Sequence, residues 1–191
     1  MLERAHFVDE KVFSPRRASG EFYIPPKESS PRVKTFTESK DMTFIGRFDF
    51  LEREFPQNRF ASWVIEGGTG VALLVPHLDR QIRDFDILTT SRSMVDEFKD
   101  AWPYFHVRWV NDWLEKRGFP VTDDKITYIM RSRVPGYRDG RIAPVLAPAL
   151  LAASKIHLYD TLPPRPQDIL DVQSLNVPLP KIERVIQRLS A

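Results

Sequence analysis

The sequence predicts an α/β chain of the α+β kind, in which short strands lie among helices and further helices follow at the C-terminal end. A short apolar run, Trp63–Ile65, is broken by glycines, and residues 84–88 then alternate polar and apolar side chains as a half-buried strand does. Apolar residues at helical spacing precede this stretch over residues 43–55. Residues 147–160 are rich in Ala and Leu, and residues 180–189 form an amphipathic pattern, so both predict C-terminal helices.

The composition is that of an ordinary globular protein. Of 191 residues, 42% are apolar and 28% are charged, which suffices for one sizeable core. The absence of cysteine excludes disulfides and thiolate chemistry. Since no segment resembles a signal peptide or is apolar enough to span a bilayer, we expect a cytoplasmic protein without a membrane partner.

Charge and composition also divide the chain. Residues 1–41 are rich in Pro, Ser and charge without a sustained period, so we expect an extended, partly ordered N-terminal arm. Residues 42–146 form the expected core, and residues 147–191 a C-terminal helical part packed on it. The net charge is only +2, but from Lys125 to the end ten Lys/Arg stand against five Asp/Glu, which places any basic face in the second half.

Two acidic residues give the first indication of chemistry. Asp84 and Asp86 are two apart on a predicted strand, so their side chains would project from one face. Two carboxylates held this close repel each other unless a cation lies between them. Carboxylate oxygens suit Mg²⁺ (or Mn²⁺), which fills its other positions with water and substrate phosphates.

The glycine turn gives the second indication. Gly67-Gly68-Thr69 at the start of a short apolar helix leaves backbone N–H groups open to an anion, and the positive end of the helix dipole favours phosphate there. A phosphate cradle beside a metal-binding acidic pair is what phosphoryl or nucleotidyl transfer requires.

Gly-Gly-Thr followed by an Asp-x-Asp strand resembles the signature of the DNA polymerase β-like nucleotidyltransferases. The stretch EGGTGVALL…RDFDILT is similar to the AbiEii-type toxin nucleotidyltransferases, and the match covers about residues 44–175. The resemblance implies a minimal nucleotidyltransferase fold, a small mixed sheet flanked by helices with a C-terminal helical layer. It also implies that Arg83 assists in binding the nucleotide.

The segment after the acidic pair predicts further elements. We expect helices over residues 93–102 and 105–116, a strand over residues 126–130 and a short strand over residues 141–143. His106 is a candidate acid/base group because histidine titrates near neutral pH, although a lone histidine among aromatic residues is more often structural. Arg131 and Arg133 would share a strand face and either bind phosphate or blunt a sheet edge.

The resemblance continues in the C-terminal helices. In AbiEii-type proteins a helix of this kind carries a functional lysine and is followed by an R-x-x-D-x-x-D segment, which matches Lys155 and Arg165-x-x-Asp168-x-x-Asp171. It implies that Lys155 contacts nucleotide phosphate and that Asp168 lies near the site. From the residues alone, Lys155 can instead extend to water and Asp168 can stabilise a helix N-terminus. Asp171 is either a partner or structural.

The expected activity is therefore transfer of a nucleoside monophosphate from a nucleoside triphosphate to an acceptor. By resemblance the acceptor is tRNA or another RNA, and the protein is a toxin with a cognate antitoxin protein. The sequence departs from the family in two places: it has no lysine over residues 70–74 and no acid over residues 126–130. The alternatives are a non-catalytic nucleotide- or RNA-binding protein that keeps the fold, and a small-molecule nucleotidyltransferase.

Overall fold

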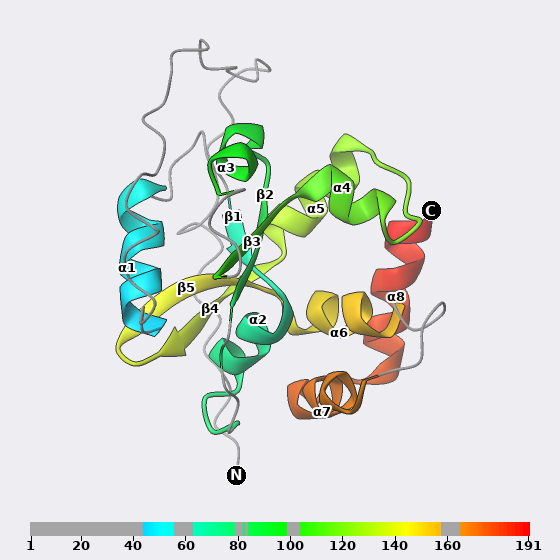
Figure 1. Ribbon diagram of the computed structural model, residues 1–191. Coiled ribbons are helices and arrows are strands. Elements are labelled where there is room, and N and C mark those ends of the chain that lie inside the picture. Colours follow the sequence, from blue (N-terminus) through cyan, green and yellow to red (C-terminus); the bar gives the residue numbers. More distant parts are fainter. Residues whose placement is uncertain (1–43, 56–62, 79–81, 83, 99–103, 158–164) are drawn as a thin grey trace.

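The architecture is a five-stranded mixed sheet with helices on both faces (Figure 1). It comes from a computed structural model that describes residues 44–55, 63–78, 82, 84–98, 104–157 and 165–191. The expected N-terminal arm lies outside these residues. The helices are α1 (Phe44–Glu54), α2 (Gly67–Leu74), α3 (Arg92–Glu97), α4 (Val110–Glu115), α5 (Asp123–Arg131), α6 (Pro148–His157), α7 (Pro166–Leu175) and α8 (Leu179–Ser190). The strands are β1 (Trp63–Ile65), β2 (Phe85–Thr89), β3 (Phe105–Trp109), β4 (Arg133–Arg138) and β5 (Arg141–Leu146).

The strands lie in the order β3-β2-β1-β5-β4. The central strand β1 pairs antiparallel with β2 and parallel with β5, and the outer pairs are β2 with β3 (parallel) and β4 with β5 (antiparallel). All three residues of β1 are buried, as expected for a central strand covered on both faces. The mixed sheet flanked by helices confirms the predicted fold class.

One face of β2 packs in the aromatic core, and the other face carries residues of the candidate site. The ring of Phe85 stacks on Phe44 of α1 with centroids 5.4 Å apart, within an aromatic cluster that also includes Phe48, Phe50, Phe98 and Phe105. Because neighbouring strand residues point to opposite faces, Asp86 projects away from α1. It meets α2, whose first residue lies beside its carboxylate.

The helix α2 lies between the sheet and the C-terminal helices. It contacts β2, β4 and β5 on one side and α6 and α7 on the other. In turn α6 packs against α7 and α8, which are grouped on the right of Figure 1. The predicted C-terminal helical layer is thus present, and it reaches the sheet through α2.

The predicted helix over residues 105–116 is wrong in its first half. Residues 105–109 form β3, which pairs with β2 over its whole length, and only Val110–Glu115 is helical. The aromatic and β-branched residues Phe105, Val107 and Trp109 alternate at the strand period, whereas Val110, Trp113 and Leu114 carry the helical spacing. The difference matters because β3 brings His106 beside Asp86.

The predicted strand over residues 126–130 is also wrong, because this segment lies in α5. Thr122 caps the helix by accepting a hydrogen bond from the Lys125 N–H, and two aspartates in the first turn favour the helix dipole. Arg131 ends α5 and Arg133 begins β4, so the two do not share a strand face. This segment is helical and forms no part of the sheet, so it cannot place a third acid on a strand beside β2, whose neighbours are β1 and β3.

The remaining predicted elements agree closely with the structure. The helices over residues 43–55 and 180–189 correspond to α1 and α8, and the strand over residues 141–143 extends to Leu146. α3 ends at Glu97, and part of the predicted helix after it lies outside the described residues. No helix among the described residues has the length and apolar character needed to cross a membrane.

Candidate active site

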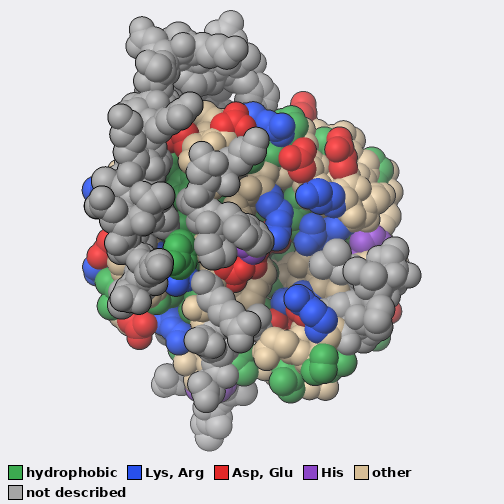
Figure 2. Space-filling view, viewed as in Figure 1, with side chains coloured by type: hydrophobic (Ala, Val, Ile, Leu, Met, Phe, Trp, Pro, Cys, Tyr) green, Lys and Arg blue, Asp and Glu red, His purple; other side chains and the backbone are tan. Residues whose placement is uncertain are grey.

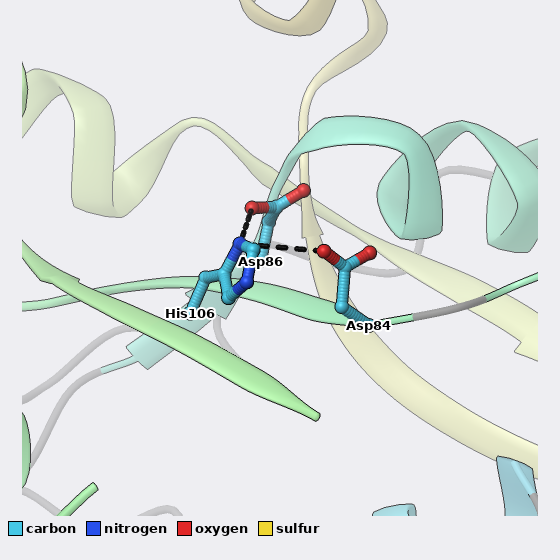
Figure 3. Close-up of side chains that lie close together, drawn as sticks. All are labelled: Asp84, Asp86 and His106. Carbon is cyan, nitrogen blue, oxygen red and sulfur yellow. Dashed lines mark ion pairs between the residues drawn. The ribbon is translucent and has the colours of Figure 1, made fainter. Parts of the chain in front are cut away.

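The acidic pair lies at the start of β2 and meets a histidine from the neighbouring strand. Asp84 precedes the strand, and Asp86 is its second residue. The parallel register sets His106 of β3 beside Asp86. His106 Nδ1 is 3.3 Å from Asp84 Oδ2 and 3.4 Å from Asp86 Oδ1 (Figure 3). The three side chains thus converge from two strands on one point.

The first residue of α2 leaves room for this pair. Gly67 has φ +62°, in the left-handed region that glycine adopts without strain. A Cβ at Gly67 would stand 2.1 Å from Asp86 Oδ2, far inside van der Waals contact. Glycine is therefore required at position 67 for two reasons, the left-handed backbone conformation and the close approach of the Asp86 carboxylate.

Backbone contacts fix β2 against the start of α2. The Thr69 hydroxyl donates to the backbone carbonyl of Asp84. The Glu66 N–H donates to the carbonyl of Asp86 at 2.8 Å. The first intrahelical bond runs from the Gly70 N–H to the Glu66 carbonyl, so the N–H groups of Gly67, Gly68 and Thr69 precede the helical ladder. The buried side chain of Thr69 thus holds the acidic pair, while its backbone belongs to the helix N-terminus.

The buried carboxylate of Glu66 and the side chains of Arg108 and Arg117 form a network next to the acidic pair. Glu66 is 1% exposed, and its Oε1 accepts from Arg108 Nη1 at 2.7 Å while Oε2 accepts from Trp113 Nε1 at 2.6 Å. Arg108 Nη2 reaches Asp86 Oδ1 at 3.1 Å, so one guanidinium bridges two carboxylates. Arg117 stacks over the Trp113 ring, 4.1 Å from its centroid. This network orients Asp86 through charge-assisted hydrogen bonds.

These contacts decide the protonation of Asp86. Burial, the largest effect, raises the pKa of its carboxyl. The hydrogen bond from His106 and the positive charges of Arg108, His106 and Lys155 together outweigh burial and lower the pKa below its usual range. Asp86 is therefore an anion at neutral pH, as a metal ligand must be.

The C-terminal helices contribute a buried cation. Lys155 of α6 lies 2.7 Å from both Asp168 Oδ1 and Asp171 Oδ2 of α7. The exposed Arg165 also donates to Asp168 through Nε and Nη2, at 2.5 and 3.2 Å. Both aspartates are buried, and Lys155 is 6% exposed. Since two carboxylates surround this ammonium, Lys155 joins α6 to α7 in addition to facing the site.

These groups enclose one cavity of about 820 Å³. Figure 2 shows Lys and Arg side chains gathered around a hollow, with acidic side chains and a histidine beside it. The residues on its wall are Glu66, Gly67, Gly68, Thr69, Ile82, Asp84, Asp86, His106, Arg108, Lys116, Arg117, Ser154, Lys155, Arg165, Gln167 and Asp168. The lining thus combines carboxylates, a helix N-terminus and several Lys and Arg side chains.

The sequence-predicted site residues come together in this cavity, with one exception. Gly67, Gly68, Thr69, Asp84, Asp86, Lys155 and Asp168 all line it, whereas Arg83 lies outside the described residues. Sequence reasoning missed Glu66, Arg108 and Arg117. The period-two pattern of Phe105, Val107 and Trp109 was the available signal, since a strand there sends His106 and Arg108 to one face.

Comparisons with known proteins show no family, and the likeness to a solved structure is distant. No family model and no curated protein matches the chain. Among solved structures, the chain is similar to an antigenic nucleotidyltransferase-like protein from Paracoccidioides brasiliensis. The match has a TM-score of 0.46 and 14% identity, and it covers 74% of this chain and 82% of that one. So distant a likeness transfers neither residues nor activity, and the functional conclusion rests on the cavity itself.

The donor set fits a divalent cation. One ligand atom from each of Asp84, Asp86 and His106 lies within 4.8 Å of the other two. Two carboxylates satisfy the preference of Mg²⁺ and Mn²⁺ for oxygen, and the adjoining cavity leaves positions for water and substrate. Arg108 donates a hydrogen bond to Asp86 from outside this cluster and so fixes the orientation of the carboxylate.

Proposed function

We propose that this chain is a nucleotidyltransferase that transfers a nucleoside monophosphate from a nucleoside triphosphate to an acceptor. One observation carries the proposal: the Asp84 and Asp86 carboxylates converge beside the N-terminus of α2 in the same cavity as Lys155. A triphosphate needs groups of both kinds, cations and N–H donors for its oxygens and carboxylates for its metal. Each kind occurs on a different element, and the fold brings them together.

Each group has a role set by its position. The N–H groups of Gly67 and Gly68 would donate hydrogen bonds to phosphate oxygens at the positive end of the α2 dipole. Asp84 and Asp86 would hold Mg²⁺ or Mn²⁺, which neutralises phosphate charge when bound. Lys155 faces the cavity from α6 and would counter negative charge that develops on the leaving phosphates.

In the proposed reaction an acceptor oxygen forms a bond to the α-phosphorus of the nucleotide. The bond from that phosphorus to the bridging oxygen breaks, and pyrophosphate leaves with the bonding electrons while the acceptor proton passes to water. Preorganised charges lower the barrier because they need no rearrangement as charge moves to the leaving group. By resemblance we propose tRNA or another RNA as the acceptor and a cognate antitoxin as a protein partner.

A specific observation supports a second candidate, a non-catalytic nucleotide- or RNA-binding protein. Two carboxylates as close as those of Asp84 and Asp86 repel each other unless a cation compensates them. In the structure Arg108 contacts Asp86 and His106 contacts both carboxylates, so the protein itself supplies a compensating cation and a further polar contact to the pair. A cavity that retains this arrangement can bind a nucleotide without turning it over.

Labelled nucleotides separate the two candidates. Purified protein is incubated with Mg²⁺ or Mn²⁺ and each α-labelled nucleoside triphosphate, with and without total RNA. The enzyme proposal expects label in RNA, in a small molecule or in the protein itself, and loss of that label in the Asp84→Asn/Asp86→Asn double variant. Asp139→Asn is the matched control, because Asp139 is an exposed aspartate in the turn between β4 and β5. Nucleotide binding without transfer favours the second candidate.

A further inference from the structure

The placement of His106 bears on the choice of metal, an inference that rests on the proposed function. Its Nδ1 approaches one oxygen of each aspartate, at 3.3 Å and 3.4 Å, and the ring is 15% exposed at the edge of the cavity. Figure 3 shows the ring directed between the two carboxylates. A nitrogen donor therefore stands where the acidic pair would hold its cation.

The spacing agrees with a shared metal ion. Nitrogen and oxygen ligands lie about 2.0–2.2 Å from a first-row metal, so two ligands at bond angles near 90–110° stand roughly 2.8–3.6 Å apart. The distances from His106 Nδ1 to the two aspartate oxygens fall in this range. In the neutral imidazole tautomer that carries its proton on Nε2, Nδ1 offers its lone pair to a metal.

Charge compensation alone does not account for the histidine at Asp86. Arg108 already meets Asp86 Oδ1 at 3.1 Å and is anchored to the buried Glu66. What His106 adds that Arg108 cannot is an imidazole nitrogen that can act as a metal ligand. Imidazole nitrogen suits first-row transition metals, whereas Mg²⁺ prefers an all-oxygen shell and gives up its water reluctantly.

We propose that His106 is a metal ligand together with Asp84 and Asp86, and that the site consequently prefers a first-row transition-metal ion such as Mn²⁺ over Mg²⁺. The two aspartates keep the site open to Mg²⁺, and the nitrogen sets the preference. Affinity for first-row divalent metals rises from Mn²⁺ through Co²⁺ to Cu²⁺ at such sites, so Co²⁺ should bind at least as tightly as Mn²⁺.

Binding measurements on the full chain test the proposal without any assay of transfer. Free Mn²⁺ is followed by electron paramagnetic resonance, first alone and then in competition with Mg²⁺. Wild type is expected to prefer Mn²⁺ by roughly tenfold or more. Pulsed measurements on bound Mn²⁺ are expected to show a directly coordinated nitrogen.

Three variants locate the nitrogen. His106→Asn keeps a polar side chain of similar reach but offers an oxygen donor in place of imidazole, so the nitrogen coupling disappears and the preference for Mn²⁺ falls. His106→Asp completes an all-oxygen set and moves the preference toward Mg²⁺. His77→Ala removes an exposed histidine outside the cluster and leaves both readouts as in wild type.

The outcomes are distinct from those of the proposed function. No saturable Mn²⁺ binding, no nitrogen coupling in wild type, or an unchanged preference in His106→Asn each overturns the assignment of His106. If one of these results is found and the protein still transfers nucleotide with Mg²⁺, only the assignment of His106 fails and the enzyme proposal is unaffected. A nitrogen-coupled Mn²⁺ site in a chain that transfers no nucleotide supports His106 as a ligand and overturns the enzyme proposal.

Discussion

The carboxylate of Asp86 lies against the backbone of Gly67, at the spot where any other residue would place its Cβ. A Cβ there would be 2.1 Å from Asp86 Oδ2. The glycine turn and the acidic strand are therefore one structural unit, although 18 residues separate them in the chain. This contact is the reason the phosphate-binding and metal-binding features of the sequence share a cavity.

Gly67→Ala tests this contact. The left-handed backbone at Gly67 would cost an alanine about 1–2 kcal/mol, and the methyl group would also displace the Asp86 carboxylate. A displacement of about 1 Å at a reacting centre can cost on the order of a hundredfold in activity. Gly118→Ala is the matched control, because Gly118 has φ +70° and nothing within 4 Å of its Cβ position. Chemical denaturation should show a loss from the backbone strain in both variants, at least as large in Gly67→Ala, whereas metal binding should be lost only in Gly67→Ala. Equal metal binding in both variants would contradict this prediction.

Lys155→Met tests the buried ion cluster. The substitution removes the ammonium that lies 2.7 Å from both Asp168 and Asp171 and leaves their carboxylates buried without it. Breaking a buried pair in this way costs about 3–5 kcal/mol of unfolding free energy. Lys181→Met, at an exposed position on α8, should change stability by less than about 0.5 kcal/mol.

A second substitution separates support from catalysis at Lys155. If the lysine acts only on the fold, Lys155→Arg should restore both stability and nucleotide transfer in proportion. If it also acts on the phosphates, stability should recover more than the rate, because a guanidinium does not place its charge where an ammonium does. Urea unfolding and single-turnover rates measured on the same preparations distinguish these results.

Arg108→Met tests the bridge between Glu66 and Asp86. Without the guanidinium, the buried Glu66 loses its 2.7 Å donor, and we expect a loss of about 3–5 kcal/mol in unfolding free energy. Arg108→Lys keeps the charge but cannot reach both carboxylates with one planar fork, so it should recover only part of that stability. Arg131→Met, at the exposed end of α5, should resemble wild type. Full recovery by lysine would show that charge alone suffices.

The lowered pKa of Asp86 predicts a pH dependence of stability in metal-free buffer. An unfolded aspartate has a pKa of about 3.9, and the folded value is lower. The contribution is thus fully present above the unfolded pKa and is lost as pH falls through the folded one. Urea unfolding from about pH 6 to pH 2 should show this loss, and Asp86→Asn should reduce it. A wild-type slope in Asp86→Asn would contradict the prediction.

Sequence reasoning succeeds here where the signals are local. The glycine turn at residues 67–69 and the strand that carries Asp86 are each defined by a few neighbouring residues. The Ala/Leu pattern around Lys155 likewise specifies a helix on its own. Their meeting in one cavity was expected only from a family resemblance, because no local pattern encodes which elements pack together.

The errors arise where tertiary contacts decide the structure. The β-formers around Ile126 suggest a strand, but the Thr122 cap and burial of Ile129 and Met130 select a helix. The spacing of Val110, Trp113 and Leu114 predicts a helix over residues 105–116, but the helix begins only at Val110, so His106 and Arg108 lie on a strand. Pairing of β3 with β2 joins residues about 20 apart, and such non-local pairing leaves no sign in a short window.

If the Asp84–Asp86 cavity turns over a nucleoside triphosphate as proposed, the protein releases pyrophosphate. Purified protein is supplied with the four nucleoside triphosphates, total RNA and either Mn²⁺ or Mg²⁺, and pyrophosphate is measured over time. We predict metal-dependent release by wild type and by Asp139→Asn, and none by Asp84→Asn/Asp86→Asn. Equal release by wild type and the double variant, or no release by wild type under any of these conditions, would contradict the account.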